Sequence, residues 1–129
     1  MKKKYLIVIA DYYQDITRGL LDSALKLIPK SNTIKIIRVP GVFEIPVTIS
    51  KNIKKYDGFL ALGCIIKGQT PHFDFISQAS TSAMMELSII NKKPIGNGII
   101  TCLNMRQAKT RKKKGTEAAK AVISVLSQK

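Results

Sequence analysis

Residues 59–66 form an unbroken apolar run, and this run constrains the fold more than any other feature of the chain. A strand that is apolar at every position has both faces covered, which is typical of a parallel sheet with helices on both sides. A polar turn follows the run and leads into a long segment of helical period, residues 70–91. The run therefore predicts a central strand followed by a long helix.

The rest of the chain repeats this alternation of strand and helix. Three further β-rich runs occupy residues 5–10, 33–39 and 94–102. Helical period is found over residues 16–28, 45–56 and 107–126, the last with an expected interruption at residues 112–115. The order favours a parallel sheet with right-handed crossovers. We expect one α/β domain over residues 1–129, a three-layer sandwich with a four-stranded parallel sheet flanked by helices.

Composition limits where such a chain can work. No apolar run approaches the roughly 18 residues of a membrane span, and the apolar run after Lys2-Lys3-Lys4 is too short for a signal peptide. We therefore expect a cytoplasmic protein with no membrane contact. Cys64 and Cys102 lie in apolar runs without C-x-x-C spacing, and His72 is the only histidine. Two buried free thiols and no metal site are expected.

The chain is strongly basic, with a formal net charge of +14. Lysine and arginine bind phosphates without any motif, so this charge raises the alternative of a nucleic-acid partner. The lysines are scattered, however, and no basic segment carries the aromatic residues that stack on single strands. The one dense run, residues 109–114, is more typical of a solvated loop. We expect no nucleic-acid partner, although basic residues converging on one face would favour that alternative.

The turn after the third expected strand has the chemistry of an anion site. Thr70 is a good N-cap and Pro71 suits the first helical position, so the amides of Gly68, Gln69 and Thr70 would point towards a bound anion. His72 follows directly, and a histidine can move protons near neutral pH. The turn predicts a phosphate-type site with an acid–base group beside it.

Two other loops follow expected strands and should meet this turn at the same edge of the sheet. The first carries Tyr12 and Tyr13, and the second spans residues 39–46 with Phe43 and Glu44. A fourth segment, residues 96–98, places two glycines around Asn97 within a strand, which indicates close approach by another backbone or by a ligand. The sequence thus predicts one ligand site built from several loops.

Together these segments closely resemble the lumazine synthase family, whose members catalyse the penultimate step of riboflavin biosynthesis. The resemblance covers nearly the whole chain and rests on residues 39–46, 63–74 and 94–101, then Gln107-Ala108, Arg111 and Lys114-Gly115. It implies a flavodoxin-like fold, and it implies a condensation of 5-amino-6-(D-ribitylamino)pyrimidine-2,4-dione with 3,4-dihydroxy-2-butanone 4-phosphate. The two small-molecule substrates react without a metal or organic cofactor in this family.

The resemblance also implies roles for particular residues. His72 matches the proposed proton shuttle. Substrate-binding positions are matched by Tyr12, Val42, Phe43, Glu44, Ile65, Ile66, Gln69, Thr70, Asn97, Arg111 and Lys114, with the phosphate held by Gly68, Gln69, Thr70 and Arg111. Tyr12 corresponds to the ring that stacks on the pyrimidine. Tyr13 stands where asparagine is more usual, and Gln69 stands where glutamate is frequent.

Members of the family form homopentamers, and some pack twelve pentamers into a shell. The resemblance therefore implies a homo-oligomer whose sites are shared between neighbours, with Asn97 and Arg111 serving the adjacent subunit. Riboflavin synthase is a candidate partner. The short N-terminal arm and the high charge favour a free pentamer. A non-catalytic flavin or lumazine carrier on the same scaffold is the alternative from another class.

Overall fold

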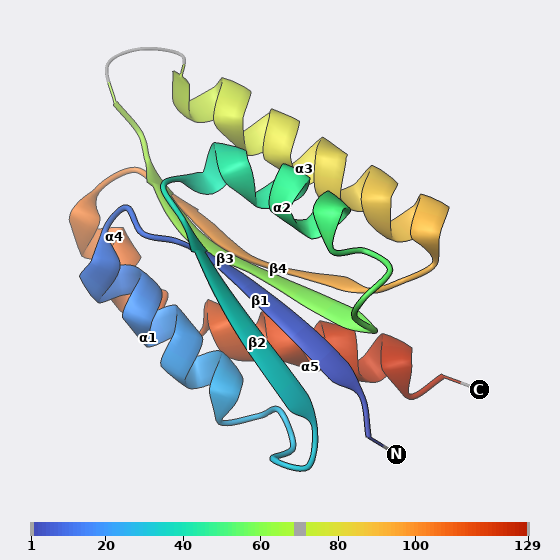
Figure 1. Cartoon of the computed structure of the whole chain (residues 1–129). Helices are drawn as coiled ribbons and strands as arrows, with labels where there is room; N and C mark the ends of the chain where they lie inside the picture. Colours follow the sequence, from blue (N-terminus) through green and yellow to red (C-terminus); the bar gives the residue numbers. More distant parts are fainter. Residues whose placement is uncertain (1, 69–71, 129) are drawn as a thin grey trace.

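The computed structural model describes residues 2–68 and 72–128. Its sheet consists of β1 (Lys4–Ala10), β2 (Thr33–Val39), β3 (Gly58–Ile66) and β4 (Ile95–Cys102). The strands lie in the order β2-β1-β3-β4, and each neighbouring pair is parallel (Figure 1). Because β4 is last in this order, it is an edge strand. The predicted parallel sheet is confirmed, and β2 has the predicted bounds.

Helices cover both faces of this sheet (Figure 1). Helices α1 (Gln14–Leu25) and α5 (Lys114–Leu126) pack on one face, and α2 (Ile45–Lys51) and α3 (His72–Asn91) pack on the other. A 3-10 turn, η1 (Val42–Glu44), precedes α2, and the short helix α4 (Met105–Thr110) follows β4. The expected three-layer α/β fold is therefore present.

The core lies in two layers on either side of the central strands. Every residue of β3 up to Ile65 is buried: Leu60 and Leu62 pack under α1 and α5, and Phe59 and Ala61 pack under α2 and α3. This burial on both faces explains why the run at residues 59–66 contains no polar side chain. It also leaves the ends of the strands and the loops after them to carry polar chemistry.

Two glycines let α5 approach its neighbours closely. A Cβ at Gly96 would meet the carbonyl oxygen of Ala118, which confirms the predicted close approach by another backbone. A Cβ at Gly115 would meet the carbonyl oxygen of Leu20 in α1. The helix before α5 ends at Thr110 and α5 begins at Lys114, so the predicted interruption at residues 112–115 is corrected to residues 111–113. Gly115 is the second residue of α5, and its lack of a side chain allows the close contact with α1.

Two helices end earlier than predicted. Helix α1 ends at Leu25, although Ile28 beyond it is still buried in the core. Helix α2 ends at Lys51 rather than near residue 56, and the amide Nδ2 of Asn52 donates to the carbonyl oxygen of Thr48 over 2.8 Å. Apolar residues at helical spacing continue past both helix ends because turn residues also reach the core.

The long helix α3 is less covered than its apolar pattern predicts. Only Ser80 and Met84 of α3 are buried, whereas the apolar residues Ala79 and Ile90 are exposed. The sheet covers one stripe of α3, and its outer face keeps several large apolar side chains in solvent, namely Phe75, Met85, Ile89 and Ile90, each more than half exposed. We call these four residues the α3 outer face. No described helix has the length and apolar character needed to span a membrane.

Candidate active site

The loops after β1, β2 and β3 enclose a cavity of about 640 Å³ at the carboxyl edge of the sheet. We call it the Tyr12 cavity. Its lining brings together seven residues predicted for the site, namely Tyr12, Val42, Phe43, Glu44, Ile65, Ile66 and His72, and four others, namely Tyr13, Gly41, Cys64 and Ile76. The prediction that these loops meet at one edge is confirmed.

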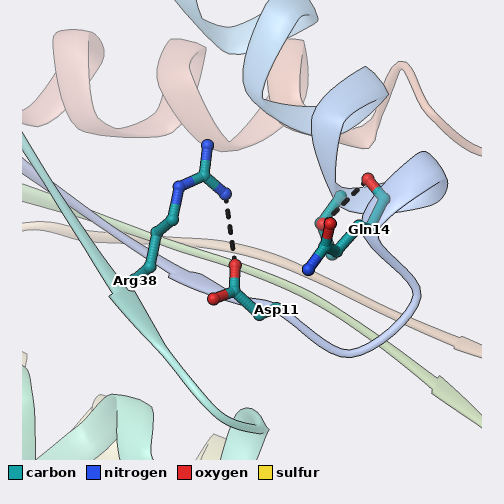
Figure 2. Close-up of polar contacts among 4 residues, drawn as sticks. Asp11, Gln14 and Arg38 are labelled. Atoms are coloured by element: carbon teal, nitrogen blue, oxygen red, sulfur yellow. Dashed lines mark hydrogen bonds and ion pairs between the residues drawn. The ribbon is translucent and has the colours of Figure 1, made fainter.

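The Tyr12 loop is held to the end of β2. Asp11 pairs with Arg38 through an Oδ1–Nη1 distance of 3.2 Å (Figure 2), and the backbone N–H of Asp11 donates to the carbonyl oxygen of Val39 over 2.8 Å. Tyr13 then adopts the left-handed conformation, with φ 59° and ψ 59°, as the N-cap of α1. The Tyr12 side chain is 66% exposed and forms part of the cavity wall.

The second loop presents an aromatic ring and a carboxylate together. Glu44 Oε1 accepts a 3.0 Å hydrogen bond from the N–H of Gly41, which braces η1. The Glu44 side chain makes no capping bond to α2. Val42 is buried beneath the loop and Phe43 is 65% exposed. A carboxylate has about four acceptor positions, so Glu44 retains several for a ligand.

The end of β3 forms an apolar floor. Ile65 is buried and Ile66 is partly buried, and Cys64 lies beside them in the lining. Burial, with a smaller contribution from the adjacent Cys102, raises the pKa of the Cys64 thiol to about 12. Both cysteines are buried and free, as predicted. A thiol with such a pKa stays neutral and makes a poor nucleophile at physiological pH.

The structure describes Gly68 and His72, the residues on either side of the central part of the turn predicted to bind an anion. Gly68 is exposed, and a Cβ at its position would meet no atom within 4 Å. His72 is the first residue of α3, has an exposed side chain and lines the Tyr12 cavity. The predicted N-cap Thr70, the predicted first helical residue Pro71 and the predicted binding residue Gln69 lie outside the described residues.

The remaining predicted residues line a second cavity, of about 500 Å³, along the edge strand β4. We call it the Arg111 cavity, and it contains Asn97, Arg111 and Lys114. The guanidinium of Arg111 donates from Nη1 to the carbonyl oxygen of Thr101 over 3.1 Å, and Asn97 Oδ1 accepts from the N–H of Ile99 over 3.0 Å. The structure of one chain thus divides the predicted site residues between two cavities.

Sequence reasoning left out residues that help to line these cavities. Ile76 follows His72 by four positions on α3, and Cys64 precedes Ile66 by two positions on β3, so helical and strand spacing could have indicated both. Lys113 adds a third cation to the Arg111 cavity, within a run that reads as solvated. Among residues 2–68 and 72–128, no three histidine, cysteine or acidic side chains gather as metal ligands.

The sheet is open and parallel, and the loops after its strands enclose a cavity. These features are typical of the class of α/β proteins that bind ligands at the carboxyl edge of the sheet. Within that class, residues 2–129 match the family model for 6,7-dimethyl-8-ribityllumazine synthase, and the chain belongs to this family.

Several relatives bear the same name, 6,7-dimethyl-8-ribityllumazine synthase. The protein from Agrobacterium fabrum is 38% identical over 100% of this chain and 97% of its own length. The Bartonella henselae protein is 41% identical over 99% of this chain and 89% of its own, and the Cutibacterium acnes protein is 39% identical over 96% and 80%. The similarity therefore extends over both cavities.

Proposed function

We propose that this chain condenses 5-amino-6-(D-ribitylamino)pyrimidine-2,4-dione with 3,4-dihydroxy-2-butanone 4-phosphate, giving 6,7-dimethyl-8-ribityllumazine, phosphate and water in riboflavin biosynthesis. It would act as one domain over residues 1–129, in the cytoplasm, without a cofactor. The observation that carries the proposal is the Tyr12 cavity, where an exposed aromatic ring, the Glu44 carboxylate and His72 surround an apolar floor. Membership of the lumazine synthase family supports it.

The Tyr12 cavity suits the pyrimidine substrate. Tyr12 offers an exposed flat ring for stacking, and Val42, Ile65 and Ile66 supply apolar contact. The ribityl chain needs acceptors for its hydroxyl groups. Glu44, beside the exposed ring of Phe43, supplies carboxylate oxygens for that purpose. These residues therefore bind and orient one of the two substrates.

The phosphate ester needs positive charge and amide donors. Arg111 and Lys114 provide charge in the Arg111 cavity, and only one guanidinium donor of Arg111 is directed to Thr101. We further propose that the backbone amides of Gly68, Gln69 and Thr70, in the turn before the long helix, donate hydrogen bonds to the phosphate. A leaving phosphate dianion would be stabilised by these groups together. The cationic lining also favours an enzyme over a flavin carrier, whose ligand need not release phosphate.

His72 lines the Tyr12 cavity, and we propose that it moves protons between the substrates. Imine formation, phosphate loss and ring closure all require proton transfer, and imidazole can accept and donate near pH 7. Most of the acceleration should come from holding the two substrates in a reactive orientation, because oriented reactants gain a large effective concentration. His72 then assists the reaction without being indispensable.

The two cavities would form one site only if a second chain brought its Arg111 cavity to the Tyr12 cavity of the first. We propose a ring of five chains in which Asn97 and Arg111 serve the neighbouring subunit. The α3 outer face supports an oligomer, because several large apolar side chains exposed along one helix are typical of subunit contacts. We favour a free pentamer, and riboflavin synthase is a candidate partner.

The test is direct conversion of the two substrates by the purified chain in the presence of a chelator. Formation of 6,7-dimethyl-8-ribityllumazine, followed by its absorbance and fluorescence, is expected to exceed the uncatalysed rate. A rate equal to that of buffer alone would contradict the proposed function.

A further inference from the structure

Lysines that lie far apart in the sequence come together at the amino edge of the sheet, opposite the Tyr12 cavity. All four strands are parallel, so the segments that lead into them meet at this edge (Figure 1). Each of these segments, namely residues 2–4, 26–32, 52–57 and 92–94, contains at least two lysines. We call their lysines the lysine face: Lys2, Lys3, Lys4, Lys26, Lys30, Lys54, Lys55, Lys92 and Lys93.

Hydrogen bonds fix these segments to one another. The N–H of Lys3 donates to Asn32 Oδ1 over 2.8 Å, which joins the segments before β1 and β2. The ammonium group of Lys93 donates to the carbonyl oxygen of Ile53 over 2.7 Å, which joins the segments before β4 and β3. An ammonium group has three donors, so Lys93 keeps two for a ligand. The lysine face is therefore carried by connected segments rather than by independent loops.

Negative charge is nearly absent from these segments. Asp57 is their only acidic residue, and its Oδ2 already accepts a 2.8 Å hydrogen bond from the N–H of Lys4. Neither ion pair formed among residues 2–68 and 72–128 involves a lysine of this face. Most of these lysines are exposed. The face thus offers a set of cations in solvent with no carboxylate partners among the described residues.

The chemistry of the lysine face fits the phosphate backbone of a nucleic-acid duplex. Lysines attract phosphates without reading sequence. Tyr56, the only aromatic residue in the four segments, is partly buried in an edge-to-face pair with Phe59 at 6.2 Å, so no exposed ring is available for unpaired bases. The described residues of these segments also include no exposed large apolar side chain that could enter a lipid bilayer.

The size of the face allows several phosphate contacts. Neighbouring strands are about 4.8 Å apart, so the starts of four strands distribute the lysines over roughly 14 Å. A DNA duplex carries one negative charge per about 1.7 Å of its axis, so a segment of that length presents several phosphates. Each contact adds to the affinity because it releases bound counterions.

We propose that the lysine face binds the phosphate backbone of double-stranded nucleic acid without sequence preference. The inference goes beyond the proposed function, because this face shares no residue with the Tyr12 cavity or the Arg111 cavity. The lysines are scattered along the sequence, and only the parallel sheet brings them to one edge. Basic residues on one face outside the cavities are the feature that favours a nucleic-acid partner.

The test measures binding of short fluorescein-labelled DNA and RNA duplexes, each in two unrelated sequences, by fluorescence anisotropy at several salt concentrations. The proteins are the wild type, the double variant Lys30→Gln/Lys54→Gln and the control Lys109→Gln/Lys120→Gln. The control removes the same charge from exposed lysines of α4 and α5, outside the lysine face. Vesicles of phosphatidylserine and phosphatidylcholine test a lipid surface instead, and melting temperatures verify that each variant is folded.

The wild type is expected to bind a duplex with a dissociation constant of about 1–100 µM at physiological salt, equally for the two sequences. Binding of either duplex supports the inference, and the tighter of the two identifies the nucleic acid. Lys30→Gln/Lys54→Gln should weaken binding by about 10-fold or more and reduce the salt dependence by about one phosphate contact for each lysine. The control should change the affinity by less than about 2-fold, because salt screens distant charges.

Three outcomes would overturn the inference. Absence of duplex binding by the wild type at about 100 µM protein would show that the face does not bind nucleic acid. Equal losses in the two double variants would assign the attraction to total charge rather than to this face. Vesicle binding that depends on Lys30 and Lys54, with duplex binding unchanged, would assign the face to a lipid surface. Lumazine formation is measured separately, and its absence in the wild type would contradict the proposed function alone.

Discussion

The Tyr12 cavity and the Arg111 cavity differ in chemistry although one chain builds both. The first has aromatic and apolar walls with one carboxylate and one histidine, and it lies where three strands end. The second contains Arg111, Lys113 and Lys114 and lies along the free edge of β4. One is suited to a neutral heterocycle and the other to an anion. Under the proposed function, each chain would carry two half-sites, which assembly would join.

The largest effect is expected from blocking that assembly. Ile89→Asp places a charge on the α3 outer face, whose burial between subunits would then cost several kcal/mol. We expect dissociation to monomers and loss of nearly all turnover, seen by light scattering and by the lumazine assay. The control is Ile36→Asp on β2, which adds the same charge to an exposed apolar position on another element. Full activity of a monomeric Ile89→Asp protein would contradict the proposal that two chains together form each active site.

Arg111→Ala tests the anion half-site. Loss of a charge-assisted contact to phosphate should weaken binding of the butanone phosphate by about 2–4 kcal/mol, which corresponds to roughly 30- to 800-fold. The affinity for the pyrimidine should change much less. The KM values of the two substrates provide the measurement. An equal loss for both substrates would assign Arg111 to the fold or to a subunit contact instead.

His72→Ala tests the acid–base group of the Tyr12 cavity. Removing proton-transfer help should lower turnover by about 10²-fold, the lower end of the usual range, because positioning of the substrates is retained. Pyrimidine binding should stay close to that of the wild type. Single-turnover kinetics from pH 6 to 8 would measure the effect. Unchanged turnover across this range would mean that His72 has only a structural role.

The smallest effect is expected from Arg38→Gln, which removes the ion pair that holds the Tyr12 loop. Both side chains are well exposed, at 54% and 37%, so the free energy of unfolding should fall by less than about 1 kcal/mol. Pyrimidine affinity should fall a few-fold because the loop after β1 is less well held, and Arg111-dependent phosphate binding should be unaffected. Chemical denaturation and substrate titration would separate the two effects. A loss of affinity for the butanone phosphate in Arg38→Gln would contradict the proposal that the two cavities bind different substrates.

Much of the fold could be predicted because strand burial leaves a direct pattern in the sequence. β2 has the predicted bounds, and the apolar run of β3 indicated burial on both faces. Helix ends were harder to predict because turn residues such as Ile28 also reach the core. Which side of α3 is buried was also hard to predict from the sequence. A helix that is apolar on two sides does not reveal which side meets the sheet.

The part of the site that is formed by the loops after the strands could be predicted from the sequence. Loops after parallel strands share an edge, so Tyr12, Glu44 and His72 could be expected together. Two features needed three-dimensional information. Arg111 folds back onto β4 at Thr101 and so enters a different cavity. The left-handed conformation of Tyr13 contradicts the local preference of tyrosine and depends on the surrounding loop.

The central claim is that a working site takes its acid–base group and its phosphate-binding arginine from two different chains. Mixing His72→Ala and Arg111→Ala proteins in equal amounts, after dissociation and reassembly, tests it most directly. In a random ring, each interface has a chance of one half times one half of joining an intact His72 to an intact Arg111. Recovery of about one quarter of wild-type activity is therefore predicted. Verified mixed oligomers with no more activity than the separate variants would contradict the claim.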